Sequence, residues 1–169
     1  MTSSIDPRHF RNVLGHFPTG VTVVTGLDSS GQPLGITIGS FVSVSLDPPL
    51  VGFLPGTSSR SWPLIAGSGS FCVNILGAGQ DELCWRFAKE PAEGEAGKFS
   101  GVEWTAAGSG SPILPGVIGW IDCDIDAVHD AGDHFFVVGR VRDMSHADDV
   151  ADAMVFFRGK VASVKTPAS

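Results

Sequence analysis

The stretch from Gly35 to Ser61 limits the fold of this chain more than any other part of the sequence. It begins with two runs, residues 35–46 and 50–54, that are rich in β-branched and apolar residues and are typical of β-strands. Asp47-Pro48-Pro49 separates the two runs, because proline cannot donate to a strand ladder. A turn of small hydroxyl residues, T-S-S-R-S, follows the second run. The stretch therefore predicts two strands followed by a polar turn.

The polar turn carries an isolated cation. Arg60 is the only lysine or arginine between Asn12 and Trp85. A guanidinium can bind two oxygens of a phosphate at once, and neighbouring hydroxyl and backbone N–H groups can donate to the same anion. Ser61 can cap a short helix with Pro63 in its first turn, which would add the positive end of a helix dipole. The alternative is a solvated loop with an incidental arginine, and the turn alone leaves both interpretations open.

The rest of the chain predicts a mainly β protein with a few short helices. Helices are expected over residues 6–17, where Asp6 is a good N-cap, and over 80–88. Strands are expected over residues 21–25, 34–39, 41–46, 50–54, 71–76, 120–128, 135–141 and 154–161. Strands and helices do not alternate, so a closed or partly closed antiparallel barrel fits better than a doubly wound sheet. We expect residues 1–169 to form a single domain with its core over 5–161, a long irregular excursion over 89–116 and a loose tail over 162–169.

One predicted strand carries a row of acids. Asp122, Asp124 and Asp126 alternate with apolar residues, which is compatible with a calcium site or with a solvent-exposed strand face. The exposed face is the preferred interpretation, because a calcium site needs more oxygens than one strand offers. If the next strand pairs with this one as a hairpin, Arg140 and Arg142 are expected to face the acids.

Composition excludes several classes of protein. The net charge is −7 and the basic residues are scattered, which argues against a nucleic-acid partner. No apolar run is long enough for a membrane span, and residues 1–11 lack the apolar core of a signal peptide, so a cytoplasmic protein is expected. Cys72, Cys84 and Cys123 are expected to be buried reduced thiols, with no metal site. With 43% hydrophobic and 17% charged residues, part of the surface is expected to pack against another subunit.

Several motifs occur in an order that resembles a known family. They are F-P-T-G-V-T-V-V-T from residue 17, G-I-T-I-G-S-F from 35, S-V-S-L-D-P-P-L-V from 43, S-S-R-S-W from 58, F-C-V-N-I-L from 71, G-D-H-F-F-V-V-G from 132 and F-F-R-G-K from 156. Together they resemble the flavin reductase-like family over residues 5–161. Within it the chain is similar to the small reductase components of two-component flavin monooxygenases acting on phenols and steroid-derived phenols. The resemblance implies an antiparallel split β-barrel of Greek-key type.

The resemblance also implies an activity. Members of the family form homodimers, oxidise NADH or NADPH, and pass a hydride to FMN or FAD. The reduced flavin then diffuses to a separate flavin-dependent oxygenase. An alternative within the same fold is an electron carrier that holds FMN tightly. A third possibility, a barrel that carries a small apolar molecule, gives no role to Arg60 and its hydroxyl neighbours.

Site residues carried over from the resemblance fall into four groups. The segment expected to line the isoalloxazine ring contributes Gly35, Thr37, Ile38, Gly39, Ser40 and Phe41. The turn expected to hold the flavin phosphate contributes Thr57, Ser58, Ser59, Arg60 and Ser61. Phe87 and Lys89 match positions near the flavin, and Asn74 is either a flavin contact or a buried amide that braces the backbone. His134 is the candidate on the nicotinamide side, and no residue is assigned with certainty to catalysis.

Overall fold

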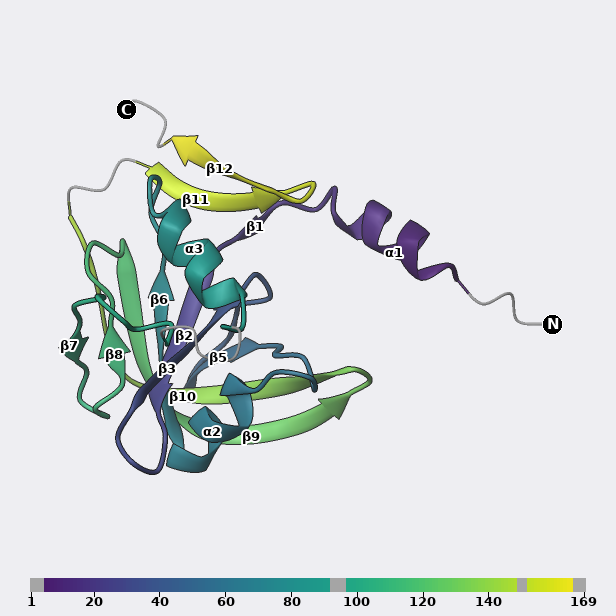
Figure 1. Ribbon diagram of the computed structural model, residues 1–169. Coiled ribbons are helices and arrows are strands. Elements are labelled where there is room, and N and C mark those ends of the chain that lie inside the picture. The colour runs from purple at the N-terminus through teal and green to yellow at the C-terminus, as the bar shows by residue number, and fades with distance from the viewer. Residues whose placement is uncertain (1–4, 92–96, 149–151, 166–169) are drawn as a thin grey trace.

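The computed structural model describes residues 5–91, 97–148 and 152–165, and this part of the chain is mainly β with three short helices (Figure 1). The helices are α1 (Pro7–Leu14), α2 (Ser61–Ser68) and α3 (Asp81–Ala88). The strands are β1 (Thr19–Gly20), β2 (Thr22–Leu27), β3 (Pro33–Ile38), β4 (Val42–Leu46), β5 (Pro49–Phe53), β6 (Ser70–Ile75), β7 (Thr105–Ala106), β8 (Pro112–Ile113), β9 (Gly119–Ala131), β10 (His134–His146), β11 (Asp152–Phe157) and β12 (Lys160–Lys165). Their pairings are antiparallel, as expected.

The strand order of the main sheet requires the sheet to curl into a barrel. Its seven strands follow the order β3-β2-β6-β9-β10-β5-β4, so its two edges are strands that are consecutive in sequence. Residues 39–41 join these edges, and the step from residue 38 to residue 42 reaches at most about 14 Å. A flat sheet of this size would place its edges about 29 Å apart. The sheet must therefore curl until the edges meet at this corner. Among the described residues β3 and β4 do not pair with each other, which leaves the barrel split along that seam.

The β9–β10 hairpin is longer than the sequence predicts. The strands pair from His134 with Ala131 to His146 with Gly119, so the turn contracts to Gly132-Asp133. Gly132 has φ +71°, a conformation that glycine adopts without strain. The hairpin projects from one side of the barrel (Figure 1), and its tip contacts the segment between β5 and α2.

The acid row divides between the surface and the core. Arg140 pairs with Asp126 at 2.7 Å and Arg142 pairs with Asp124 at 2.9 Å, which confirms the expected cross-strand pairs. The expectation that all three acids lie on a solvent-exposed strand face is wrong for Asp122, which is fully buried. Its carboxylate accepts hydrogen bonds from the backbone N–H, at 2.9 Å, and from the hydroxyl of Ser109. The irregular segment after residue 97 folds over this end of the strand and hides the carboxylate from solvent.

A second, three-stranded sheet follows the order β1-β11-β12. β11 and β12 form a hairpin in this sheet. The sequence predicted one final strand over residues 154–161 and a loose tail from residue 162, which is wrong for residues 162–165. Arg158 and Gly159 adopt φ values of 49° and 78°, the positive values that a two-residue hairpin turn requires. β12 then pairs back on β11 as far as Lys165. Residues 166–169 of the expected tail lie outside the described residues.

Two clusters of buried side chains form the core. The first includes Phe53, Trp62 and Phe71, with ring centroids 5.0–5.4 Å apart in edge-to-face contacts around Phe53. The second lies beneath α3 and includes Phe87 and Leu114. The three cysteines are buried free thiols, as predicted. No helix in the described ranges is long and apolar enough to cross a membrane.

Helix α1 extends away from the barrel (Figure 1). It begins as expected, with the Asp6 carboxylate accepting a hydrogen bond from the His9 N–H at 3.0 Å, but it ends at Leu14 rather than at residue 17. Its apolar side chains Phe10, Val13 and Leu14 are all more than half exposed. The apolar face predicted from the sequence is present, yet the described part of this chain does not cover it.

Candidate functional site

The hydroxyl turn links the end of β5 to the start of α2. Its first turn closes with a hydrogen bond from the Ser59 N–H to the Gly56 carbonyl at 3.1 Å. The Ser59 hydroxyl then accepts from the Trp62 N–H at 3.1 Å, so Ser59, one residue before the N-cap, binds a free N–H group of the first helical turn. Ser61, expected to be the cap, lies one position inside the helix and is buried. The N-cap position is therefore one residue earlier than the sequence suggests, and Arg60 occupies it without a side-chain hydrogen bond to the helix.

Arg60 has the properties that an anion-binding group needs. Its side chain is exposed, and within residues 5–91, 97–148 and 152–165 neither an ion pair nor a hydrogen bond engages the guanidinium. It is the N-cap residue of α2, where the first backbone N–H groups have no intrahelical acceptor. Ser58 is exposed beside it. These residues fit a phosphate, because the donors converge on one helix end and no internal acceptor competes for the guanidinium.

The tip of the β9–β10 hairpin lies against the hydroxyl turn. The Thr57 N–H donates to the Asp133 carbonyl at 2.9 Å, and the Phe135 N–H donates to the Pro55 carbonyl at 3.0 Å. The Thr57 hydroxyl donates to the same Asp133 carbonyl at 3.1 Å. Gly56 and His134 form a β-bridge. Residues about 76 positions apart in sequence are thus brought together mainly by backbone atoms.

His134 is exposed at this tip and is oriented by its neighbour. Its Nδ1 lies 2.7 Å from the Asp133 carboxylate, and the hydrogen bond and charge of His134 lower the pKa of that carboxyl. The other ring nitrogen, Nε2, points toward Gly56, where an added Cβ would lie 3.9 Å from it. The imidazole therefore presents its edge to the glycine beside the hydroxyl turn.

The segment expected to line the flavin ring forms the corner that closes the barrel. Gly35 and Ile38 are buried, and the Gly35 carbonyl accepts a hydrogen bond from the Lys98 ammonium at 3.2 Å. The Thr37 hydroxyl donates to the Cys84 carbonyl of α3 at 2.7 Å. The Ser40 hydroxyl donates to the Leu54 carbonyl at 3.2 Å and accepts from the Leu54 N–H at 3.0 Å. Both hydroxyls thus anchor the corner to its surroundings.

Gly39 and Phe41 complete this corner. Gly39 is exposed, and a Cβ added there would lie 3.1 Å from the Thr19 hydroxyl oxygen. Phe41 is half-buried against the first core cluster, so one part of its ring remains on the surface. The corner therefore presents Gly39 and part of Phe41 at the surface.

Residues 54–57 connect these three parts. Leu54 is bonded to Ser40 at the corner, and the next residues are bonded to the hairpin tip at Asp133 and Phe135. Beyond residue 57 the same segment runs directly into the Arg60 turn. The ring segment, the phosphate turn and the hairpin tip are therefore joined through four consecutive residues.

A model of the flavin reductase-like domain matches residues 14–165. The chain belongs to this family. It is 49% identical over 157 residues to a flavin reductase of Pseudomonas putida, covering 93% of this chain and 89% of that protein. It is 44% identical over 162 residues to HsaB of Rhodococcus jostii, the reductase subunit of a flavin-dependent monooxygenase. That match covers 96% of this chain and 80% of HsaB.

A solved flavin reductase-like structure gives the fold comparison. The NADH:FAD oxidoreductase SgcE6 of Streptomyces globisporus, in complex with NAD and FAD fragments, has a TM-score of 0.86 and 32% identity. The match covers 99% of this chain and 100% of that one. The split β-barrel that the resemblance implies is confirmed by the sheet order and by this likeness.

Two residues carried over from the family lie in the core. Asn74 is fully buried, its amide nitrogen donates to the Val23 and Pro112 carbonyls at 3.2 Å, and its oxygen accepts from the Leu114 N–H at 2.8 Å. Of the two roles left open for Asn74, these bonds favour bracing of the backbone. Phe87 is also fully buried, which prevents its side chain from contacting a cofactor. Both residues therefore support the site from beneath.

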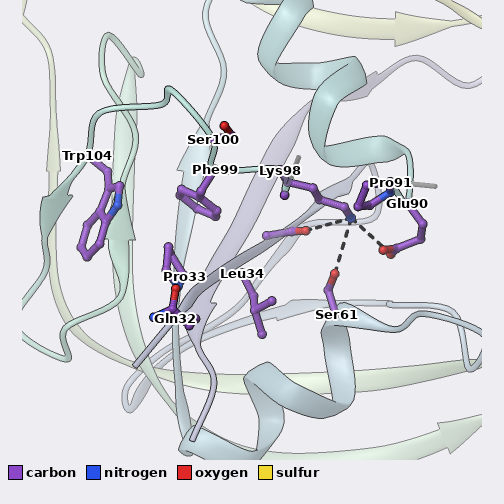
Figure 2. A pocket seen from close by; sticks show the side chains of 12 residues that line it. Gln32, Pro33, Leu34, Ser61, Glu90, Pro91, Lys98, Phe99, Ser100 and Trp104 are labelled. Atoms are coloured by element: carbon purple, nitrogen blue, oxygen red, sulfur yellow. Dashed lines mark hydrogen bonds and ion pairs between the residues drawn. The ribbon is translucent and has the colours of Figure 1, made fainter. Parts of the chain in front are cut away.

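Lys98 is a buried cation beside the predicted site segments that the sequence did not indicate. Its side chain is 9% exposed, and its Nζ contacts the carbonyls of Gly35 and Phe87, the Ser61 hydroxyl and the Glu90 carboxylate at 3.2–3.4 Å (Figure 2). The ammonium thereby joins β3, α2 and the end of α3. A lysine in a polar, glycine-rich segment normally remains solvated, so the sequence carries no signal for this burial. Lys89, which was predicted instead, is exposed one residue after α3 ends.

Proposed function

We propose that this chain is an NAD(P)H-dependent flavin reductase that transfers a hydride from nicotinamide to FMN or FAD. The reduced flavin is supplied to a separate, flavin-dependent monooxygenase component. The observation that carries the proposal is the joining of the barrel corner, the Arg60 turn and the His134 tip through residues 54–57. The relatives support it, since two of them are a flavin reductase and a monooxygenase reductase subunit.

The phosphate end of the flavin is assigned to the start of α2. Arg60 and Ser58 provide exposed donors, and the helix N-terminus adds a favourable potential for an anion. Thr57 and Ser59 act differently from their neighbours: their hydroxyls shape the turn through bonds to Asp133 and Trp62. The turn is thus held in place before a phosphate binds, which lowers the entropy that binding would otherwise cost.

The ring end is assigned to the corner and the hairpin tip. When bound, the flavin and the nicotinamide supply the hydride chemistry themselves. The chain contributes position: Gly39 admits a close approach, Ser40 anchors the corner, and His134 places a hydrogen-bonding imidazole beside Gly56. Asp133 holds that imidazole through Nδ1, so the ring is oriented before the nicotinamide arrives.

We also assign the protein to the cytoplasm as a homodimer. Three free thiols suit a reducing compartment. Exposed apolar side chains on α1 and on β4, where Val42, Val44 and Leu46 are 43–93% exposed, suit contact with a second copy. Light scattering coupled to size exclusion should give twice the chain mass of 17.6 kDa. A mass of one chain at micromolar concentration would contradict the dimer. It would not bear on the reductase activity, which is tested separately.

The deciding experiment is a kinetic matrix. NADH and NADPH are each combined with FMN, FAD and riboflavin, and nucleotide oxidation is followed with the purified chain. Oxidation that requires added flavin supports the reductase. A yellow protein whose FMN exchanges slowly, and whose oxidation rate does not respond to added flavin, would favour the electron carrier instead. No oxidation in any combination, in a folded sample, would refute the reductase.

A further inference from the structure

The ammonium of Lys98 is engaged entirely by groups of the chain itself (Figure 2). Its Nζ lies 3.2–3.4 Å from four acceptors: the Gly35 and Phe87 carbonyls, the Ser61 hydroxyl and the Glu90 carboxylate. An ammonium has three N–H donors, so these acceptors are enough to use all of them. The carboxylate also balances its charge. Any effect of Lys98 on a ligand must therefore act through the residues that it holds.

Two of these acceptors lie at the ends of the proposed flavin segments. Gly35 begins the segment assigned to the ring, and Ser61 ends the turn assigned to the phosphate. The ends of the two segments that are nearer along the chain are already joined, because the Ser40 hydroxyl bonds to the backbone of Leu54. Lys98 joins the two far ends, residues 35 and 61. The ring segment and the phosphate turn are thus connected at both ends.

The Ser61 hydroxyl faces Lys98 and the interior. Ser61 is 4% exposed, and its Oγ contacts Nζ at 3.4 Å. It follows Arg60 directly and is the first residue of α2, so a group that holds Ser61 also sets the position of the proposed phosphate-binding guanidinium. The other end of the connection is firm, because Gly35 lies in β3 and is paired with Thr25 of β2. The start of α2 is therefore the part that depends on this contact.

We propose that Lys98 is a positioning residue for the flavin, which sets the spacing between the ring segment and the start of α2. The inference rests on the proposed function, because it needs a ligand that spans both segments. FMN reaches from the ring segment to Arg60 through its phosphate, whereas riboflavin occupies the ring segment alone. Without Lys98, binding of FMN must also bring the two segments into register, which lowers affinity for FMN and spares riboflavin.

The test compares the two flavins in Lys98→Met, which keeps an unbranched side chain and removes the ammonium. Fluorescence titration gives each Kd, and urea unfolding verifies that the variant is folded during the titration. Loss of one hydrogen bond to a charged group predicts a rise of about tenfold in the Kd of FMN, with riboflavin within about twofold. The KM of FMN should rise with its Kd, while kcat at saturating FMN changes less than about twofold. Lys165→Met, at the exposed end of β12, is the matched control and should alter neither Kd.

A double-mutant cycle tests the contact between Lys98 and Ser61. Ser61→Ala leaves Nζ three acceptors, so it is the milder change and the one to use if Lys98→Met does not fold. Alone it should raise the Kd of FMN about threefold and leave riboflavin unchanged. Combined with Lys98→Met it should add less than about twofold, because the connection is already broken. An unchanged FMN Kd in Ser61→Ala, or full additivity of the two changes, would overturn the proposal.

A second cycle separates position from charge. In Lys98→Met the Glu90 carboxylate loses its counter-charge and would itself repel a phosphate. Lys98→Met combined with Glu90→Gln leaves no net charge, as in the parent pair. Positioning predicts that the tenfold loss for FMN persists in this double variant. Recovery of FMN affinity to within about twofold of the parent would assign the loss to charge and refute positioning.

The remaining outcomes distinguish this inference from the proposed function. Equal losses for FMN and riboflavin in Lys98→Met would indicate general damage and count against the inference, as would an unchanged Kd for FMN. In both cases the parent chain still binds flavin, so the reductase assignment stands. A folded parent chain that binds neither flavin would instead refute the proposed function, and the inference with it.

Discussion

Removing the Arg60 side chain is the most direct perturbation of the proposed phosphate site. Because no described residue pairs with its exposed guanidinium, Arg60→Ala should leave the free energy of unfolding within about 0.5 kcal/mol of the parent value. A hydrogen bond to a charged group contributes about 1.5–3 kcal/mol. Loss of one such bond to phosphate therefore predicts a rise in the Kd of FMN of about 10-fold to 100-fold.

Fluorescence titration with FMN and riboflavin separates a phosphate effect from damage to the ring site. Riboflavin lacks the phosphate, so its Kd should change by less than about twofold in Arg60→Ala. Arg60→Lys keeps the charge but loses the forked geometry, and its FMN affinity should lie between those of the parent and the alanine variant. An unchanged FMN Kd, or equal losses for FMN and riboflavin, would refute the assignment of Arg60 to the phosphate.

Three further outcomes are expected. Gly139→Ala should destabilise the fold by about 1–3 kcal/mol in urea unfolding, because its Cβ would lie 2.9 Å from Phe71 Cε1, whereas Gly20→Ala, with open space around it, should be nearly neutral. Burial raises the pKa of the Cys123 thiol to about 12, so this thiol should resist alkylation at pH 8 until the chain unfolds. The folded state favours the neutral thiol, and this contribution to the free energy of unfolding should be lost as the pH rises from about 8.5 toward 12. His134→Ala should raise the KM of NADH roughly fivefold to tenfold and leave FMN binding unchanged, and an unaltered KM would argue against a nicotinamide role.

Local chemistry made part of this fold predictable. The turn between β2 and β3 consists of D-S-S-G-Q-P, residue types that favour hairpin turns, and in the structure the Asp28 carboxylate accepts hydrogen bonds from Ser30 and from the Gln32 N–H. These bonds lower the pKa of Asp28. All the groups involved lie within five residues of one another, so a short sequence contains the whole interaction. The Asp6 cap of α1 was predictable for the same reason.

Features that depend on distant segments were not predictable in this way. Asp122 has the alternating context of an exposed strand residue, and only the arrival of Ser109 from another segment buries it. Lys98 acquires four acceptors from separate elements, none of which is close in sequence to it except Glu90. The backbone bonds that join Thr57 to Asp133 have no residue signature, because any residue type except proline can make them. The two halves of the candidate site were therefore found separately, and their contact was not.

The main-chain tether between the hairpin tip and the hydroxyl turn has a practical consequence for protein engineering. Since carbonyl and N–H groups provide most of the attachment, the tip should keep its position when the side chains at Asp133 and His134 are randomised together. A combinatorial library at these two positions can then sample new preferences for reduced nicotinamide cofactors, including synthetic ones, on an unchanged frame. Proline at residue 57 or 135 would remove a tethering N–H, so Thr57 and Phe135 should be kept unchanged in such a library.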